Sequence, residues 1–147
     1  MTMKIAIASD HAGFELKELI KDYITKTNNS IVDFGTNNSD SVDYPDFAAA
    51  ASKAVSSGEV DRGILVCGSG QGMMMSANKF KNIRAALCND LYSAKMSRLH
   101  NDSNILAIGG RIVGKDLALE IIKTWMETEF EGGRHQRRVD KLNSLQG

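Results

Sequence analysis

A cysteine beside a run of glycines is the feature of this chain that most directly indicates chemistry. Residues 67–72 read Cys-Gly-Ser-Gly-Gln-Gly and follow the apolar residues 63–66. Three glycines in five positions free the backbone of side-chain bulk, so several N–H groups can converge on one anion. Such donors can also favour the thiolate of Cys67, which makes it a candidate base or nucleophile. The pattern is typical of an enzyme that handles an anionic intermediate.

A structural interpretation of the same segment is also open. Free cysteine is among the most buried residue types and commonly fills the end of a strand. The glycine spacing also differs from nucleotide-binding fingerprints, because a dinucleotide loop needs its third glycine one position after Gly72 and no Gly-Lys-Ser/Thr motif is present. The loop therefore predicts anion binding without specifying a nucleotide.

The composition is that of a folded domain. The chain has 147 residues, of which 42% are hydrophobic and 24% charged, and its 18 basic residues balance its 18 acidic ones. Because the net charge is zero, the protein has no overall positive electrostatic potential that would attract nucleic acid or an anionic membrane. No apolar run approaches the ~20 residues that span a bilayer, and a strand pattern begins too early for a signal peptide. We expect one cytoplasmic domain over residues 1–147.

Elements that would position the glycine loop follow from hydrophobic periodicity. Short apolar runs predict strands at residues 4–8, 31–34, 63–67, 84–88 and 105–108. Helical spacing of apolar residues predicts a helix after most of the strands, and residues 73–79, behind the glycine loop, are expected to begin the helix that follows the third strand. Five such units imply an α/β fold with a five-stranded parallel sheet and helices on both faces. The fold class is a three-layer α/β/α Rossmann-like sandwich with a C-terminal helical tail.

Polar side chains follow four of the predicted strands. Ligands of parallel sheets gather at the carboxyl ends of the strands, so this edge is where we expect a site. The residues in question are Asp10 and His11 after the first strand, residues 67–72 after the third, Asn89 and Asp90 after the fourth, and Arg111 after the fifth.

The C-terminal tail differs in character from the rest of the chain. A Glu-Gly-Gly break at residues 131–133 precedes the densest basic cluster, Arg134, Arg137 and Arg138. If the tail is helical, Arg134 and Arg138 share one face at i,i+4 spacing. The cluster is either a solvated helix end or an anion clamp that a hinge presents to a neighbouring subunit, and both interpretations stay open.

Eight short motifs together resemble one family. In this order and spacing they are similar to the type B ribose-5-phosphate isomerases, a family that includes galactose-6-phosphate and allose-6-phosphate isomerases. The resemblance runs nearly end to end and rests on residues 5–14, 43–45, 67–70, 77–79, 83–86, 100–102, 109–111 and 131–135.

The resemblance implies an activity and an assembly. The expected enzyme interconverts D-ribose 5-phosphate and D-ribulose 5-phosphate through a cis-enediolate, in the non-oxidative pentose phosphate pathway. It is expected to be a homodimer or a dimer of dimers whose active sites are shared between subunits, with an arm of about residues 132–147 contacting the partner. No metal and no organic cofactor is implied, and the three histidines are far apart in the sequence.

The resemblance also implies roles for single residues. Cys67 is the expected base; some relatives use a later glutamate instead, but this chain has Met73 in that stretch. His100 is the expected ring-opening residue, with Asp10 nearby. Cys88 is expected to be structural, and His135 and Arg137 to have packing and surface roles. The remaining expected residues are Ser69 with the backbone of Gly68, Gly70, Gln71 and Gly72 for the enediolate, Tyr44 and Asn101 for the sugar, and His11, Arg111, Arg134 and Arg138 for the phosphate.

Two alternatives to this function stay open. One is an isomerase of a six-carbon sugar phosphate, since a longer substrate differs by only one hydroxymethylene group. The other is a non-catalytic module that binds a sugar phosphate or a nucleotide, because a fold does not determine a function. Cys67 distinguishes the binding module from the enzyme, since binding alone has no need of a thiol at the loop.

Overall fold

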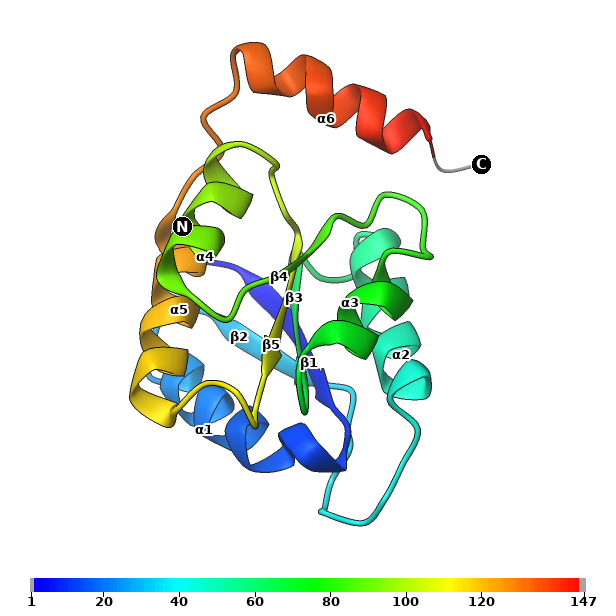
Figure 1. Ribbon diagram of the computed structural model, residues 1–147, viewed down its shortest axis with the longest axis vertical. Helices are drawn as coiled ribbons and strands as arrows, with labels where there is room; N and C mark the ends of the chain where they lie inside the picture. Colours follow the sequence, from blue (N-terminus) through cyan, green and yellow to red (C-terminus); the bar gives the residue numbers. More distant parts are fainter. Residues whose placement is uncertain (1, 146–147) are drawn as a thin grey trace.

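A five-stranded parallel sheet covered by helices on both faces forms the body of the protein (Figure 1). The structure is a computed structural model and describes residues 2–145. The sheet order is β2-β1-β3-β5-β4. The elements are β1 (Lys4–Ser9), a 3-10 turn (His11–Gly13), α1 (Phe14–Thr25), β2 (Ser30–Asp33), α2 (Tyr44–Ser56), β3 (Arg62–Cys67), α3 (Gln71–Ala77), β4 (Ala85–Leu87), α4 (Leu91–Leu99), β5 (Ile105–Gly109), α5 (Lys115–Glu127) and α6 (Arg134–Ser144).

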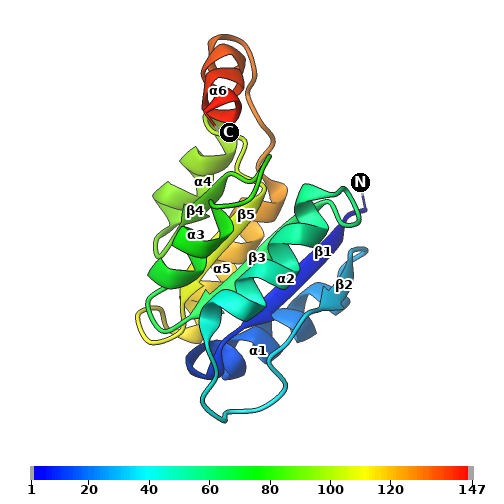
Figure 2. The ribbon, with the colours of Figure 1, turned by 90° about the vertical axis from the view of Figure 1, so that its right-hand side faces the viewer.

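Side-chain alternation along the strands builds two different cores. In β1, Ile5 and Ile7 belong to the core that includes residues of α1, α4 and α5, whereas Ala6 and Ala8 belong to the core that includes residues of α2 and α3. Figure 2 shows α2 and α3 together on one face of the sheet. Both faces are buried, which explains why the central strands read as continuous apolar runs. The small alanine side chains let α2 and α3 lie close to the sheet, next to the strand ends that carry the glycine loop.

The predicted elements are confirmed in type and order, with boundaries shifted by one or two residues. The difference between prediction and structure that matters for the site is the start of α3, which begins at Gln71 and not at the predicted residue 73. Gly70 adopts φ +86° directly before this helix, so the chain turns into the helix while still inside the glycine loop. The basic tail is helical, as its i,i+4 spacing allowed.

The sheet order brings three polar loops to one edge. β1 lies between β2 and β3, and β3 lies between β1 and β5, so the loops that follow β1, β3 and β5 are neighbours at the carboxyl edge. α6 lies at the opposite end of the molecule (Figure 1). None of the helices formed by residues 2–145 combines the length and apolar character needed to cross a membrane.

Candidate active site

The Cys67 thiol lies at the carboxyl edge with a hydrogen-bond donor beside it. Cys67 is the last residue of β3, and the period of two along the strand turns its side chain, like that of Leu65, toward the face of α2 and α3. The side chain is buried, and the Gly70 N–H donates to its Sγ at 3.2 Å. A donor aimed at sulfur favours negative charge there, which is the state in which a thiol acts as a base.

Gly70 is at a position that no other residue fits without strain. Its φ is +86°, and a Cβ built on it would lie 2.5 Å from Leu87 Cδ1 and 3.1 Å from the backbone carbon of Ile108. A side chain would therefore push the loop away from β5. The glycine keeps its own N–H within reach of the Cys67 sulfur.

We expect Gly70→Ala to destabilise the fold more than Gly58→Ala does. Gly58 has a similar φ of +82°, but nothing lies within 4 Å of the point that a Cβ would occupy, so that variant isolates the backbone strain of about 1–2 kcal/mol. Gly70→Ala adds overpacking of about 1–3 kcal/mol. Urea unfolding of both variants measures the difference, and equal unfolding free energies would contradict the proposed contact with Leu87 and Ile108.

An open cavity lies directly in front of the thiol. Tyr44, the first residue of α2, has its ring packed over Gly72, where any Cβ would overlap the ring. The volume of about 460 Å³ is within the range of small-molecule sites. The cavity is lined by Tyr44, Cys67, Gly68, Ser69, Gly72, Arg111 and Ile112.

A second cavity of about 610 Å³ adjoins the first, and Arg111 lines both. His11 lines the second cavity, and its Nδ1 accepts the Val42 N–H at 3.2 Å. The proton of the neutral imidazole is therefore on Nε2, which is free to donate to an anion. Asp10 is buried and holds the turn in place, because its Oδ1 accepts the N–H groups of Ala12 and Gly13 at 2.9 and 3.1 Å.

Asn89, which the sequence placed at the carboxyl edge but to which it assigned no role, ties the glycine loop to β5. Its Nδ2 donates to the Ser69 carbonyl at 3.2 Å, and its Oδ1 accepts the Gly109 N–H at 2.8 Å. The Ser69 hydroxyl in turn accepts the Gln71 N–H at 3.2 Å. The available signal was the place of Asn89 directly after a strand. Asn89 is thus a positioning residue for the loop.

His100 lies at the other edge of the sheet. It follows α4, which runs back from the carboxyl edge, and its backbone N–H donates to the Met96 carbonyl at 2.9 Å. Its ring stacks on that of His135 from α6, with centroids 4.2 Å apart and planes 13° from parallel. Burial and then the neighbouring His100 lower the pKa of His135. Within one chain, the end of α4, which His100 follows, and the end of β1, which Asp10 follows, lie at opposite ends of the molecule (Figure 1).

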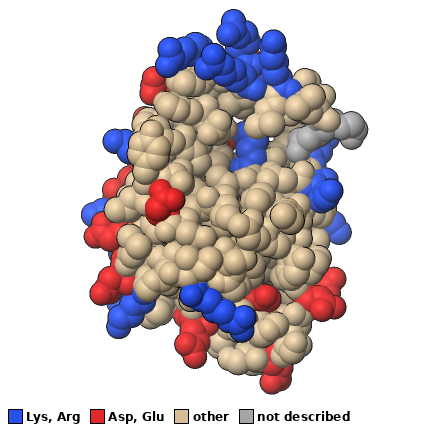
Figure 3. All heavy atoms as spheres, viewed as in Figure 1, with Lys and Arg blue, Asp and Glu red and all other residues tan. Residues whose placement is uncertain are grey.

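Asn101 and the predicted arginines of the tail are at the same end as His100. Asn101 follows His100 directly, and Arg134 and Arg138 are exposed one turn apart on α6. Lys and Arg side chains gather at this end of the molecule (Figure 3). One chain therefore holds the predicted residues in two separate groups, the thiol with the glycine loop at one edge and a histidine with exposed arginines at the other.

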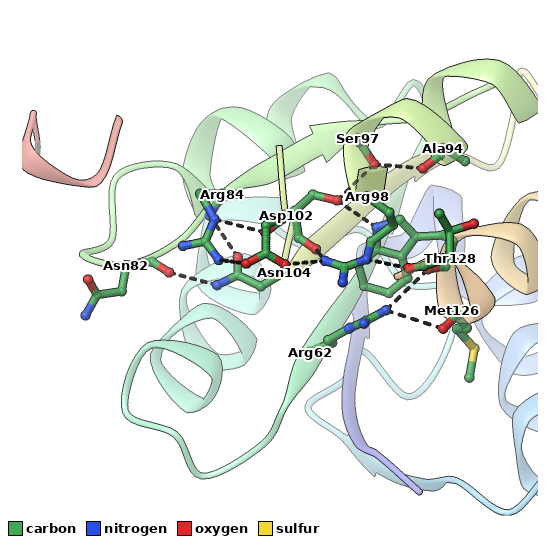
Figure 4. Close-up of polar contacts among 12 residues, drawn as sticks. Arg62, Asn82, Arg84, Ala94, Ser97, Arg98, Asp102, Asn104, Met126 and Thr128 are labelled. Carbon is green, nitrogen blue, oxygen red and sulfur yellow. Dashed lines mark hydrogen bonds and ion pairs between the residues drawn. The ribbon is translucent and has the colours of Figure 1, made fainter. Parts of the chain in front are cut away.

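A network of arginines holds the turn that follows His100 (Figure 4). Asp102 has φ +48°, and its carboxylate binds Arg98 at 2.9 Å and Arg84 at 3.4 Å. Arg98 also donates to the carbonyl of Thr128 at 3.1 Å, which braces the segment leading to α6. Burial, and then the charge of Arg98, lower the pKa of nearby Arg62 to about 10. The several guanidinium groups around one carboxylate make this end electropositive.

Known proteins resemble this chain in both sequence and fold. Ribose-5-phosphate isomerase B of Escherichia coli is 46% identical over 143 residues, which cover 97% of this chain and 96% of that protein. A ribose-5-phosphate isomerase B structure from Clostridium thermocellum is 54% identical with a TM-score of 0.96, over 97% of both chains.

Similarity also extends to a structure with a bound sugar phosphate. The ribose-5-phosphate isomerase B of Mycoplasma genitalium, solved with ribulose-5-phosphate, is 39% identical with a TM-score of 0.93 and covers 97% of this chain and 95% of its own. Residues 5–142 match the Ribose/Galactose Isomerase family. Because the match covers nearly the whole sequence and the fold, this chain belongs to the Ribose/Galactose Isomerase family.

Proposed function

We propose that this chain interconverts D-ribose 5-phosphate and D-ribulose 5-phosphate through a cis-enediolate. The observation that carries the proposal is the Cys67 thiol, which faces a cavity of about 460 Å³ and accepts the Gly70 N–H at 3.2 Å. A base beside backbone donors is what proton transfer next to a carbonyl requires. Family membership and the ribulose-5-phosphate bound to the Mycoplasma genitalium enzyme support this substrate.

The glycine loop supplies the proton-transfer chemistry. The Cys67 thiolate removes the proton from C2 of the open-chain aldose, and the electron pair forms the C1–C2 double bond while O1 gains negative charge. The thiol then returns the proton to C1 as the O2 proton passes to O1, which leaves the ketose. The N–H groups of the loop from Gly68 to Gly72 and the Ser69 hydroxyl hold the two oxygens. Each such donor is worth about 3–4 kcal/mol of transition-state stabilisation.

Ring opening needs a residue that one chain does not bring to Cys67. His100 is suited to take the proton of the anomeric hydroxyl while the ring oxygen is protonated. It stacks on His135 of α6, however, and α6 lies at the end of the molecule away from the carboxyl edge. We therefore assign the site to two subunits of a homodimer, or of a dimer of dimers, in which the His100 of one chain joins the Cys67 and Asp10 of another.

The residues proposed to bind the phosphate are also divided between the two subunits. His11 Nε2 and Arg111 face the second cavity at the carboxyl edge. Arg134 and Arg138 would come from the partner, because arginines offer paired donors that match a phosphate. Tyr44 covers the sugar from one chain and Asn101 contacts it from the other. Residues 132–147 are then an arm of a single domain that reaches the partner.

A substrate comparison in the presence of EDTA tests the function. We expect ribose 5-phosphate to be turned over without loss of rate when the chelator is present, because proton transfer by Cys67 needs no metal. Galactose 6-phosphate and allose 6-phosphate at equal concentration should react more slowly. Preference for a hexose phosphate would reassign the substrate and leave the mechanism intact, whereas no turnover of any of the three would favour a binding module. With this activity, we expect the enzyme to work in the cytoplasm, in the non-oxidative pentose phosphate pathway.

A further inference from the structure

The carboxylate of Asp102 binds two arginines from different elements to the turn that follows His100. Its Oδ1 accepts a hydrogen bond from Arg98 Nη1 at 2.9 Å, and its Oδ2 accepts one from Arg84 Nη2 at 3.4 Å. Arg84 Nε also donates to the Asp102 carbonyl at 2.9 Å. Figure 4 shows the two guanidinium groups on either side of Asp102. Both the side chain and the backbone of this residue are therefore held, at a φ of +48° that few residues other than glycine adopt.

The same two arginines also hold α6 and the segment that leads to it. Arg98 is buried at the end of α4, and its Nε donates to the Thr128 carbonyl at 3.1 Å. Arg84 lies directly before β4, and its Nη1 donates to Asn143 Oδ1 on α6 at 3.2 Å. The position of α6 relative to the turn therefore depends on contacts that meet at the Asp102 carboxylate.

The imidazole of His100 is placed by the turn and by α6 together. Its backbone N–H donates to the Met96 carbonyl of α4 at 2.9 Å, and its ring stacks on His135 of α6 with centroids 4.2 Å apart. Asp102 supports both sides of this arrangement, since its arginines hold the turn on one side and α6 on the other. Displacement of a catalytic group by about 1 Å can cost roughly 10²-fold in rate.

We propose that Asp102 is a positioning residue for ring opening, which holds the His100 imidazole in place by binding Arg98 and Arg84. The proposal rests on the proposed function, in which the His100 imidazole of one subunit moves the ring-opening proton in the site of the other. Asp102 acts through His100 and not on the sugar, so its contribution to the rate exists only while that imidazole is present.

Asp102→Asn tests the charge of the carboxylate with little change in shape. Asparagine is nearly the same size and also tolerates a positive φ, so the turn can form while the ion pairs with Arg98 and Arg84 are lost. We expect the kcat with ribose 5-phosphate to fall about tenfold, part of the loss that a misplaced catalytic group causes. Arg84→Lys is a second variant, which keeps the charge but loses the paired donors and should lower the kcat in the same direction. Circular dichroism checks the fold of both.

A double-mutant cycle with His100→Asn separates positioning from a general structural role. His100→Asn alone should lower the kcat by roughly 10²- to 10⁴-fold. Asp102→Asn added to it should cause no further loss, because a residue that acts through His100 has nothing left to position. A change that merely unfolds part of the protein would lower the kcat by the same factor in both backgrounds.

Arg62→Met is the matched control, because Arg62 is a partly buried guanidinium at the same end whose Nη1 donates to the carbonyls of Trp125 and Met126. It should keep the wild-type kcat. Wild-type kcat in Asp102→Asn, an equal loss in Arg62→Met, or full additivity in the double variant would each overturn the positioning role. Wild-type kcat in His100→Asn alone would instead show that the ring-opening step of the proposed function is wrong, and the role of Asp102 would fail with it.

Discussion

Replacement of Cys67 by alanine is expected to lower kcat by roughly 10²- to 10⁴-fold, the range contributed by a general acid–base residue. The KM should change little, because in the proposed mechanism the thiol only moves a proton, whereas substrate binding is assigned to the cavity walls, which include Tyr44 and Arg111. Steady-state kinetics with ribose 5-phosphate measure both constants. The loss appears in kcat because the interaction is made in the transition state.

Cys88→Ala provides the matched control for the loss of a thiol. Cys88 is fully buried, and burial raises the pKa of its thiol to about 11, so it stays protonated near neutral pH. Its Sγ is 3.9 Å from the Ser97 hydroxyl in the core. We expect this variant to keep its kcat and to lose some stability. Retained turnover in Cys67→Ala, or equal loss in both variants, would exclude Cys67 as the base.

A heterodimer of two inactive chains is expected to recover about half of the wild-type activity, because a shared site in a two-fold dimer leaves one of its two sites intact. One chain carries Cys67→Ala and the other His100→Asn. The intact site combines the Cys67 of the second chain with the His100 of the first. The remaining site lacks both residues and is silent.

Co-expression with two different affinity tags, followed by purification on both, isolates the mixed species for assay. The two homodimeric variants are the controls and should each be nearly inactive. A site contained within one chain predicts an inactive heterodimer, since each chain then has one damaged site. That result, or a failure of the two tags to purify together, would contradict the shared site.

Local sequence was sufficient to predict the glycine loop and its supports. The alternation of isoleucine and alanine along residues 5–8 can be seen within a few neighbouring residues. The same is true of the point where the apolar run of β3 gives way to glycines. The same local signals predicted the carboxyl edge as the place of Asp10, His11, Cys67 and Arg111. They missed the early start of α3, which depends on the left-handed φ of Gly70.

Positions and contacts that depend on distant segments of the chain could not be predicted in the same way. His100 and Arg134 were assigned by resemblance, and their distance from Cys67 within one chain depends on the return path of α4 and the direction of α6. Asn89 has an ordinary local sequence, and its bridge between Ser69 and Gly109 exists only because β4 lies beside β5.

The sequence by itself determined the parallel α/β fold, the glycine loop with its thiol and, through its motifs, the family. Only the tertiary structure decided that His100 stacks on His135 beside Glu131, and that this group lies away from the thiol. The physical reason is the distance along the chain over which each kind of interaction acts. Periodicity and glycine conformation act over a few residues, whereas the approach of α6 to α4 depends on side-chain packing between segments that are distant along the chain.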